Sequence, residues 1–254
     1  MGVRKVLSRA LDIIVVPAVL LSLGLAFLYA PREKTMHDVY RIFYFHVPAT
    51  ASAGLGIAIV FVCSVLYLRT RDRRYDLVAA AAAEVAVLFG ALGIGMGMLW
   101  AKPVWGTFWI PGDIHLMTTA VVFLIYVAYL MLRGAIDDDE RRARLAAVVG
   151  IFGMAGAPVV YFSIRIIHVG NHPVLQGLTP RMQLTFMVCM TTMLLFFTFI
   201  LLRRVRLELT RAEYERLRLD LLSLAERHGA HAQRRIVAGA EPAEPTTVET
   251  PRLS

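Results

Sequence analysis

The sequence has few charged residues and few cysteines. Only 18% of its 254 residues are charged, whereas 57% are hydrophobic and the mean hydropathy is +0.61. This composition excludes an ordinary soluble domain. The two cysteines, Cys63 and Cys189, fall inside apolar runs, which favours buried thiols. There is no Cys-x-x-Cys-His sequence, so the chain is not itself a c-type cytochrome.

Catalytic patterns are also missing. The sequence contains no nucleophile–base arrangement, phosphate-binding loop or carboxylate pair, and we therefore predict that the protein is not an enzyme. The formal net charge of +8 does not indicate nucleic acid binding. The arginines stand beside the ends of apolar runs, where they anchor helices, and not in a basic patch with interleaved aromatic residues.

Long apolar runs are abundant. A transmembrane helix needs about 20 predominantly apolar residues, and six runs of that kind follow one another with short polar joints between them. We predict an all-α fold, a polytopic membrane helical bundle with six transmembrane helices. The predicted spans cover residues 13–30, 47–68, 77–100, 114–132, 145–164 and 182–202.

The arginines predict the orientation of these spans. Cytoplasmic joints carry an excess of Lys and Arg. The N-terminus, the joints at residues 69–76 and 133–144, and the segment that follows the last span are rich in arginine. We therefore expect both termini in the cytoplasm and the other three joints on the outer face of a plasma or inner membrane.

The predicted outer face collects most of the histidines and all of the tryptophans. Neutral imidazole is a common axial ligand of haem iron. Two such ligands on opposite sides of a flat macrocycle, with indole rings along its edge, would make an outward-facing haem site, although zinc also accepts histidine together with other ligands. The residues concerned are His37, His46, Trp100, Trp105, Trp109, His115, His168 and His172.

The joint at residues 100–113 is rich in aromatic residues. Its prolines and glycines argue against a continuous helix and predict an irregular loop on the outer membrane surface. Three roles are open to such a loop: a platform for haem, an interface for a partner, or a segment sealed to the bilayer.

Three short motifs resemble those of a known family. Trp105, Gly106, Trp109, Asp113, Leu116 and Thr118 fit the pattern Trp-Gly-x-x-Trp-x-Trp-Asp-x-Arg-Leu-Thr, with one residue inserted before Asp113 and one after Leu116. This pattern is similar to the tryptophan-rich signature of the haem-handling family of cytochrome c biogenesis, in its heme exporter protein C (CcmC) branch. Residues 44–48 resemble the first histidine motif of that family, and residues 162–165, 172–174 and 180–182 resemble its second. The likeness covers residues 10–203.

The resemblance implies a function and a site. In the family the two outer histidines are axial haem ligands, the tryptophan-rich loop holds the haem edge, and haem passes to a periplasmic haem chaperone beside an ABC-type, ATP-driven transporter. Carried over by position, the transient, non-covalent bis-histidine ligation falls on His46 and His172, with His168 as the rival of His172. The further cofactor-binding residues implied are Trp100, Trp105, Trp109 and Asp113.

The chain departs from the family pattern at three positions. Phe108 and Pro111 replace two expected aromatic positions, and His115 stands where an arginine is expected. An arginine pairs with a haem propionate, whereas a neutral histidine does so only weakly. Two other readings therefore remain open. A cofactor-free scaffold subunit of a transporter would bind no haem, and a membrane di-haem electron-transfer cytochrome would carry histidines nearer the bilayer interior.

Smaller features complete the expectations. We expect three parts in the chain: a haem-handling membrane domain at 1–203, a cytoplasmic amphipathic helix at 204–228 and a disordered tail at 229–254. Glu84, inside the third span, is a candidate relay or ligand contact, but we favour a structural pairing or a short reach to the interface, with Arg73 and Arg74 about two turns away. The glycines of that span are expected to serve helix packing, and Pro158 to kink the fifth span.

Overall fold

The structure is helical throughout the part that it describes. The computed structural model describes residues 2–165 and 178–239, and these residues contain no β-strand. Two short segments accompany the α-helices: a π-helical turn, η1, and a 3₁₀ segment, η2. The elements are α1 (Gly2–Gly24), η1 (Leu25–Tyr29), η2 (Asp38–Ile42), α2 (Phe43–Thr70), α3 (Arg73–Trp105), α4 (Ile114–Ala135), α5 (Asp139–Met154), α6 (Gly156–Arg165) and α7 (Pro180–Gly239).

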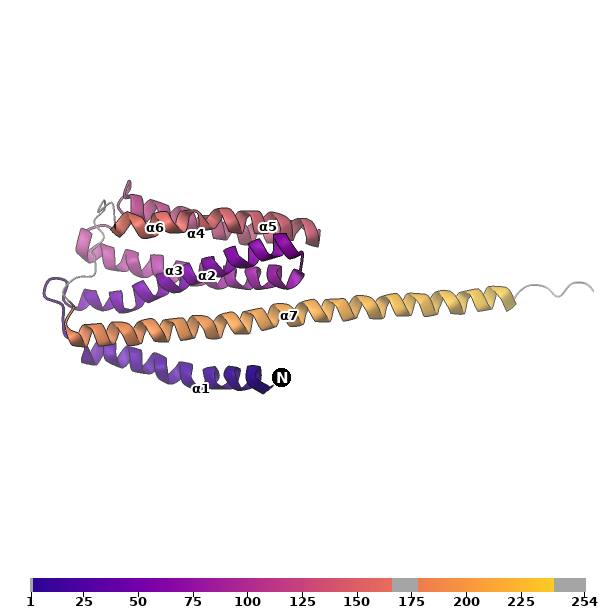
Figure 1. Cartoon of the computed structure of the whole chain (residues 1–254), viewed down its shortest axis with the longest axis horizontal. Coiled ribbons are helices and arrows are strands. Elements are labelled where there is room, and N and C mark those ends of the chain that lie inside the picture. Colours follow the sequence, from indigo (N-terminus) through magenta and orange to yellow (C-terminus); the bar gives the residue numbers. More distant parts are fainter. Residues whose placement is uncertain (1, 166–177, 240–254) are drawn as a thin grey trace, which may run out of the picture. The chain divides into compact units, whose positions relative to one another are not determined.

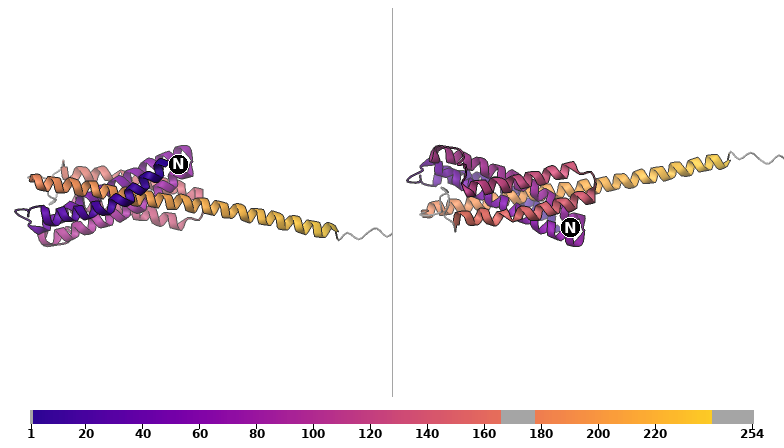
Figure 2. Two further views of the ribbon diagram at one scale, coloured as in Figure 1. Left: turned by 90° about the horizontal axis from the view of Figure 1, so that it is seen from below. Right: turned by 90° about the horizontal axis from the view of Figure 1, so that it is seen from above.

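Six segments of the described chain are long and apolar enough to cross a membrane, which confirms the predicted six-span architecture. The protein is a multi-pass membrane protein. Figures 1 and 2 show α2 to α6 packed together, with α1 along the first part of α7. The membrane orientation stays a prediction. The spans are Leu11–Tyr29, Asp38–Thr70, Arg73–Trp105, Ile114–Ala135, Asp139–Phe162 and Pro180–Arg227.

Aspartates start three of the helices. The carboxylate of Asp72 accepts a hydrogen bond from the Arg74 N–H at 2.9 Å, and that of Asp113 accepts one from the Leu116 N–H at 3.0 Å. Asp138 does the same for Arg141 at 2.6 Å. Each carboxylate satisfies a backbone donor that has no partner within the helix, and this fixes the starts of α3, α4 and α5.

Helices α2 and α3 approach each other closely on small residues. A Cβ atom added to Gly56 would lie 2.8 Å from the Cβ of Ala86, and one added to Gly93 would lie 2.5 Å from the Cγ2 of Thr50. Only glycine fits at these two positions. The packing role predicted for the glycines of the third span is thus met at Gly93, whereas a Cβ at Gly95 would meet nothing within 4 Å.

The fifth span is interrupted, as predicted from Pro158. Helix α5 ends at Met154 and α6 begins at Gly156. Proline has no N–H to donate, and its ring clashes with the carbonyl four residues earlier, which here belongs to Met154. The break therefore falls where Pro158 forbids a regular helix.

Ion pairs join helices within the bundle. The guanidinium of partly buried Arg133 on α4 forms two hydrogen bonds with the carboxylate of buried Asp76 on α3, at 2.5 and 3.1 Å. Glu84 also forms a structural ion pair, but its partner is Arg204 on α7 and not Arg73 or Arg74. The sequence alone could not indicate this partner, which lies 120 positions away in the chain.

Helix α1 is held to α7 by polar contacts. The hydroxyl of Ser22 donates to that of Thr192 at 2.8 Å, and the buried thiol of Cys189 donates to the Ser22 carbonyl at 3.8 Å. Cys63 is likewise a buried free thiol, so both cysteines are placed as predicted.

The chain divides into two compact units, residues 1–209 and 210–254. Helix α7 is continuous from Pro180 to Gly239. The division of the chain at residues 203/204 and 228/229, with an amphipathic helix and a disordered tail, stays a prediction.

We expect the loss of the Asp76 carboxylate to destabilise the bundle strongly. Asp76→Asn leaves the Arg133 guanidinium buried without a counter-charge, which costs about 3–5 kcal/mol. Thermal unfolding in mild detergent should show a clearly lower midpoint. The matched control is Arg203→Met, which breaks an exposed pair with Asp12 and should cost less than about 1 kcal/mol. Equal midpoints for the two variants would contradict a structural role for the buried pair.

Cysteine labelling tests the orientation, because the two native cysteines are buried. In intact cells, a membrane-impermeant maleimide should label Pro111→Cys, in the joint between α3 and α4, and not Asp137→Cys, between α4 and α5. Both positions are exposed in the structure. The reverse pattern would place the termini outside.

Candidate functional site

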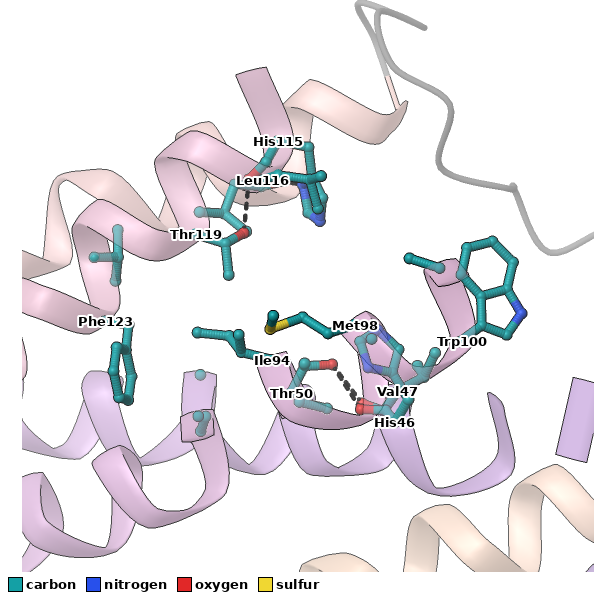
Figure 3. Close-up of a pocket in the computed structure, with 18 of the residues that line it drawn as sticks. His46, Val47, Thr50, Ile94, Met98, Trp100, His115, Leu116, Thr119 and Phe123 are labelled. Atoms are coloured by element: carbon teal, nitrogen blue, oxygen red, sulfur yellow. Dashed lines mark hydrogen bonds between the residues drawn. The ribbon is translucent and has the colours of Figure 1, made fainter. Parts of the chain in front are cut away.

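A cavity lies where α2 and α4 begin and α3 ends (Figure 3). Its volume is about 830 Å³, within the range of about 300–1,000 Å³ that is typical of ligand and cofactor sites. Residues of η2, α2, α3, α4, α6 and the joint between α3 and α4 line it. Among the described residues of this lining, none is Asp, Glu, Lys or Arg. The cavity therefore suits a largely apolar ligand with a few polar contacts.

His46 lies in the first turn of α2 and faces the cavity. Its Nδ1 lies 2.8 Å from the carbonyl oxygen of Gly93 on α3. Because a carbonyl oxygen only accepts, Nδ1 carries the proton and Nε2 is the nitrogen with the lone pair. Gly97 accommodates the ring, since an added Cβ there would lie 3.0 Å from the His46 Cε1. The close approach of α2 and α3 therefore orients this imidazole.

His115 faces the same cavity from α4. Its Nδ1 lies 3.2 Å from the carbonyl oxygen of Val160 on α6, so the same tautomer follows. Asp113 does not line the cavity. It caps α4, and by fixing the first turn of that helix it places His115.

Three tryptophans and a phenylalanine gather at one end of the cavity. Trp100 is buried, and its ring meets that of Trp105 edge-on with centroids 5.1 Å apart. Trp109 and Phe108 line the cavity from the joint. Together these rings form an aromatic part of the cavity wall.

A glycine and a lysine fix the C-terminal end of α3. Gly106, with φ of 77°, adopts the left-handed conformation that ends the helix. The ammonium of Lys102 donates to the Gly106 carbonyl at 3.0 Å and lies 5.3 Å from the Phe108 ring centroid. These contacts position the aromatic joint over the cavity.

The joint between η1 and η2 forms a tight turn. The carboxylate of Glu33 accepts hydrogen bonds from the backbone N–H of Met36 at 2.5 Å and of Thr35 at 2.7 Å. The bond from Met36 is the main reason that the pKa of Glu33 lies below its usual value, and the Thr35 bond adds to it. The turn brings Met36 and Tyr40 to the cavity.

The structure brings together four of the residues predicted from the sequence, His46, Trp100, Trp105 and Trp109. The predicted ligands His168 and His172 lie outside the described residues. The prediction of an irregular loop from residue 100 was partly wrong. Helix α3 continues to Trp105, because Pro103 removes one donor but leaves the last turn intact, and the loop covers only 106–113.

Sequence reasoning gave His115 no site role. It was counted among the outer-face histidines, but it was not selected as a ligand and stands where the family pattern has an arginine. The available signal was its place two residues after a capping aspartate, at the same predicted membrane level as His46. Its anchor, the Val160 carbonyl, is 45 residues away and had no sequence signal.

A zinc site is not supported by the described residues. Zinc in proteins takes three or four ligands drawn from histidine, cysteine and carboxylates. In that part of the chain no three such residues gather. Two histidines in an apolar cavity fit a flat metal-centred macrocycle, which supplies the other donors itself.

The fold and the cavity define a multi-pass helical membrane protein with a cavity lined by histidine and tryptophan. The model of the heme exporter protein C (CcmC) family matches residues 2–220, and the chain belongs to this family.

Individual relatives match over part of their length. The chain is 30% identical to heme exporter protein C of Escherichia coli K12 over 159 residues, which is 61% of this chain and 64% of the relative. It is 34% identical over 150 residues to that of Bradyrhizobium diazoefficiens, which is 58% of this chain and 56% of the relative. The protein of that name from Paracoccus denitrificans is 28% identical over 142 residues, covering 56% of this chain and 58% of the relative. The chain thus spans less than two thirds of each of these relatives.

Proposed function

We propose that the protein binds haem in this cavity and presents it on the outer face of the membrane for cytochrome c maturation. The observation that carries the proposal is the imidazole of His46, which the Gly93 carbonyl orients at the wall of a cavity whose described lining has three tryptophans and no charged residue. Haem offers an iron for that imidazole and an apolar macrocycle for the walls.

The binding is transient and non-covalent. The cysteines of the chain, Cys63 and Cys189, do not line the cavity, so the residues around it include no thiol for a covalent haem bond. The family resemblance assigns the second axial position to His172, with His168 as the rival. Trp100, Trp105 and Trp109 would hold the macrocycle edge, and Asp113 would act by fixing the start of α4.

The proposed role is delivery and not catalysis. Haem would pass to a haem chaperone on the outer face, with ABC-type transporter subunits beside this protein. The relatives are named heme exporter protein C, which supports haem as the transported group. The aromatic joint at 106–113 lies at the cavity and offers exposed backbone and ring surface where an acceptor would dock.

Absorbance spectroscopy tests the proposal directly. The full chain purified in mild detergent and supplied with haem should show a Soret band, and His46→Ala should retain haem at least about tenfold more weakly, because the iron loses a ligand. His172→Ala and His168→Ala are measured beside it. A wild-type protein that takes up no haem would instead favour the cofactor-free scaffold. Fixed haem content with reversible redox cycling and no transfer would favour the electron-transfer cytochrome.

A pair of glycine variants tests the orientation of His46. Gly97→Ala places a methyl group 3.0 Å from the His46 Cε1, closer than normal contact, so the ring must turn and haem retention should fall by about tenfold. Gly95→Ala is the matched control on the same helix, because its Cβ meets nothing within 4 Å. Equal haem retention in the two variants would contradict an ordered His46 ligand.

A further inference from the structure

Residues 100–113 contain one cation, Lys102, and one anion, Asp113. The carboxylate of Asp113 accepts a hydrogen bond from the Leu116 N–H and caps α4. Lys102 is exposed in the last turn of α3. Its ammonium is therefore the positive charge that this aromatic segment offers to a ligand.

Lys102 stands at the mouth of the cavity. Figure 3 shows Trp100 at one end of the cavity and Phe123 at the other. Phe123 belongs to the middle of α4, whereas Trp100 is close to the end of α3, so the Trp100 end is the one nearer the predicted outer face. Lys102 follows Trp100 by two residues, and both Ala101 and Trp105 line the cavity. The charge thus lies at the rim of the cavity and not on its described wall.

Two contacts hold the ammonium of Lys102 beside the cavity. It donates to the carbonyl oxygen of Gly106 at 3.0 Å, and it lies 5.3 Å from the ring centroid of Phe108, a residue of the lining. An ammonium has three N–H donors, and the carbonyl accepts from one of them. The side chain is a flexible stem of four carbons, which can stay on the aromatic surface while its charged end reaches an anion.

Haem would bring carboxylates to this end of the cavity. Its propionates are anionic at neutral pH, and burying an unpaired carboxylate in an apolar environment is costly. The described lining has no charged residue, so the propionates belong at the mouth. The family pattern has an arginine where this chain has His115. A cation that pairs with a propionate would therefore come from another position.

We propose that the ammonium of Lys102 pairs with a propionate of haem at the mouth of the cavity. The proposal rests on the proposed haem-binding function and names the residue that recognises the carboxylate edge of the ligand. Because Lys102 is exposed, the pair contributes modestly to affinity and weakens as salt is added. It favours the orientation in which the propionates face outward.

Other cations lie in the joint between η1 and η2. Arg32 and Arg41 both pair with the carboxylate of Asp38, at 2.5 and 3.0 Å. Lys34 is exposed and stands two residues before Met36, which lines the cavity. Lys34 is therefore the rival for the propionate. The contact of Lys102 with a ring of the lining favours Lys102.

The test compares haem with its dimethyl ester, in which both propionates are esterified and uncharged. The full chain in mild detergent is titrated with each compound, and the dissociation constants are read from absorbance. Lys102→Gln should weaken the binding of haem by about fivefold at low salt and leave the binding of the ester unchanged, because only haem offers a carboxylate. The difference between wild type and variant should vanish in about 1 M salt. Lys102→Arg keeps the charge and should keep most of the affinity for haem.

Arg181→Gln is the matched control. The guanidinium of Arg181 also lies over an aromatic ring, 5.4 Å from the ring centroid of Tyr29, and neither residue belongs to the cavity lining. This variant should leave both affinities unchanged.

Three results would overturn the proposal. Equal weakening of haem and ester binding in Lys102→Gln would mean that the lysine only fixes the end of α3. A loss specific to haem in Lys34→Gln, with none in Lys102→Gln, would assign the propionate to Lys34 and leave the haem-binding function intact. A wild type that binds neither haem nor the ester would overturn the proposed function and this proposal together.

Discussion

The close contact between α2 and α3 is the constraint on which the site depends. Gly56 and Gly93 have no side chain that would hold the two helices apart. Ala86 and Thr50 pack against them from the facing helix. The same contact orients His46, because Gly93 supplies the carbonyl that its Nδ1 meets and Gly97 leaves room for its ring. A substitution that separated these helices would therefore disturb both the packing of the bundle and the orientation of the imidazole.

The ion pairs between helices lie in a different part of the bundle from the cavity. Asp76 and Arg133 neutralise each other between α3 and α4, and Glu84 is matched by Arg204. Burying a charge in an apolar environment is costly unless a partner and hydrogen bonds are present. Because these charges are paired away from the cavity, the described part of the cavity wall is neutral, and the proposed apolar ligand would displace no bound counter-ion there.

The six spans could be predicted because a run of about 20 apolar residues is a local signal, and the break before Pro158 because proline acts within one turn. His46 and the three tryptophans were found from short motifs. What escaped prediction depends on contacts distant in sequence. Arg204 lies 120 residues from Glu84, and the Val160 carbonyl lies 45 residues from His115. The end of α3 at Trp105 was missed for a different reason: proline is usually read as a breaker, but the last turn tolerates Pro103.

A histidine in place of an arginine changes how haem would be held. An arginine would pair with a propionate, whereas a neutral histidine at position 115 would do so only weakly. Because the described cavity walls carry no charged residue, the propionates would be poorly solvated inside and would point to the mouth, towards water. Haem would then be held through its iron and its apolar edge, and its propionate edge would face outward. Release to an acceptor would then require no loss of a buried ion pair, which agrees with the proposed delivery of haem.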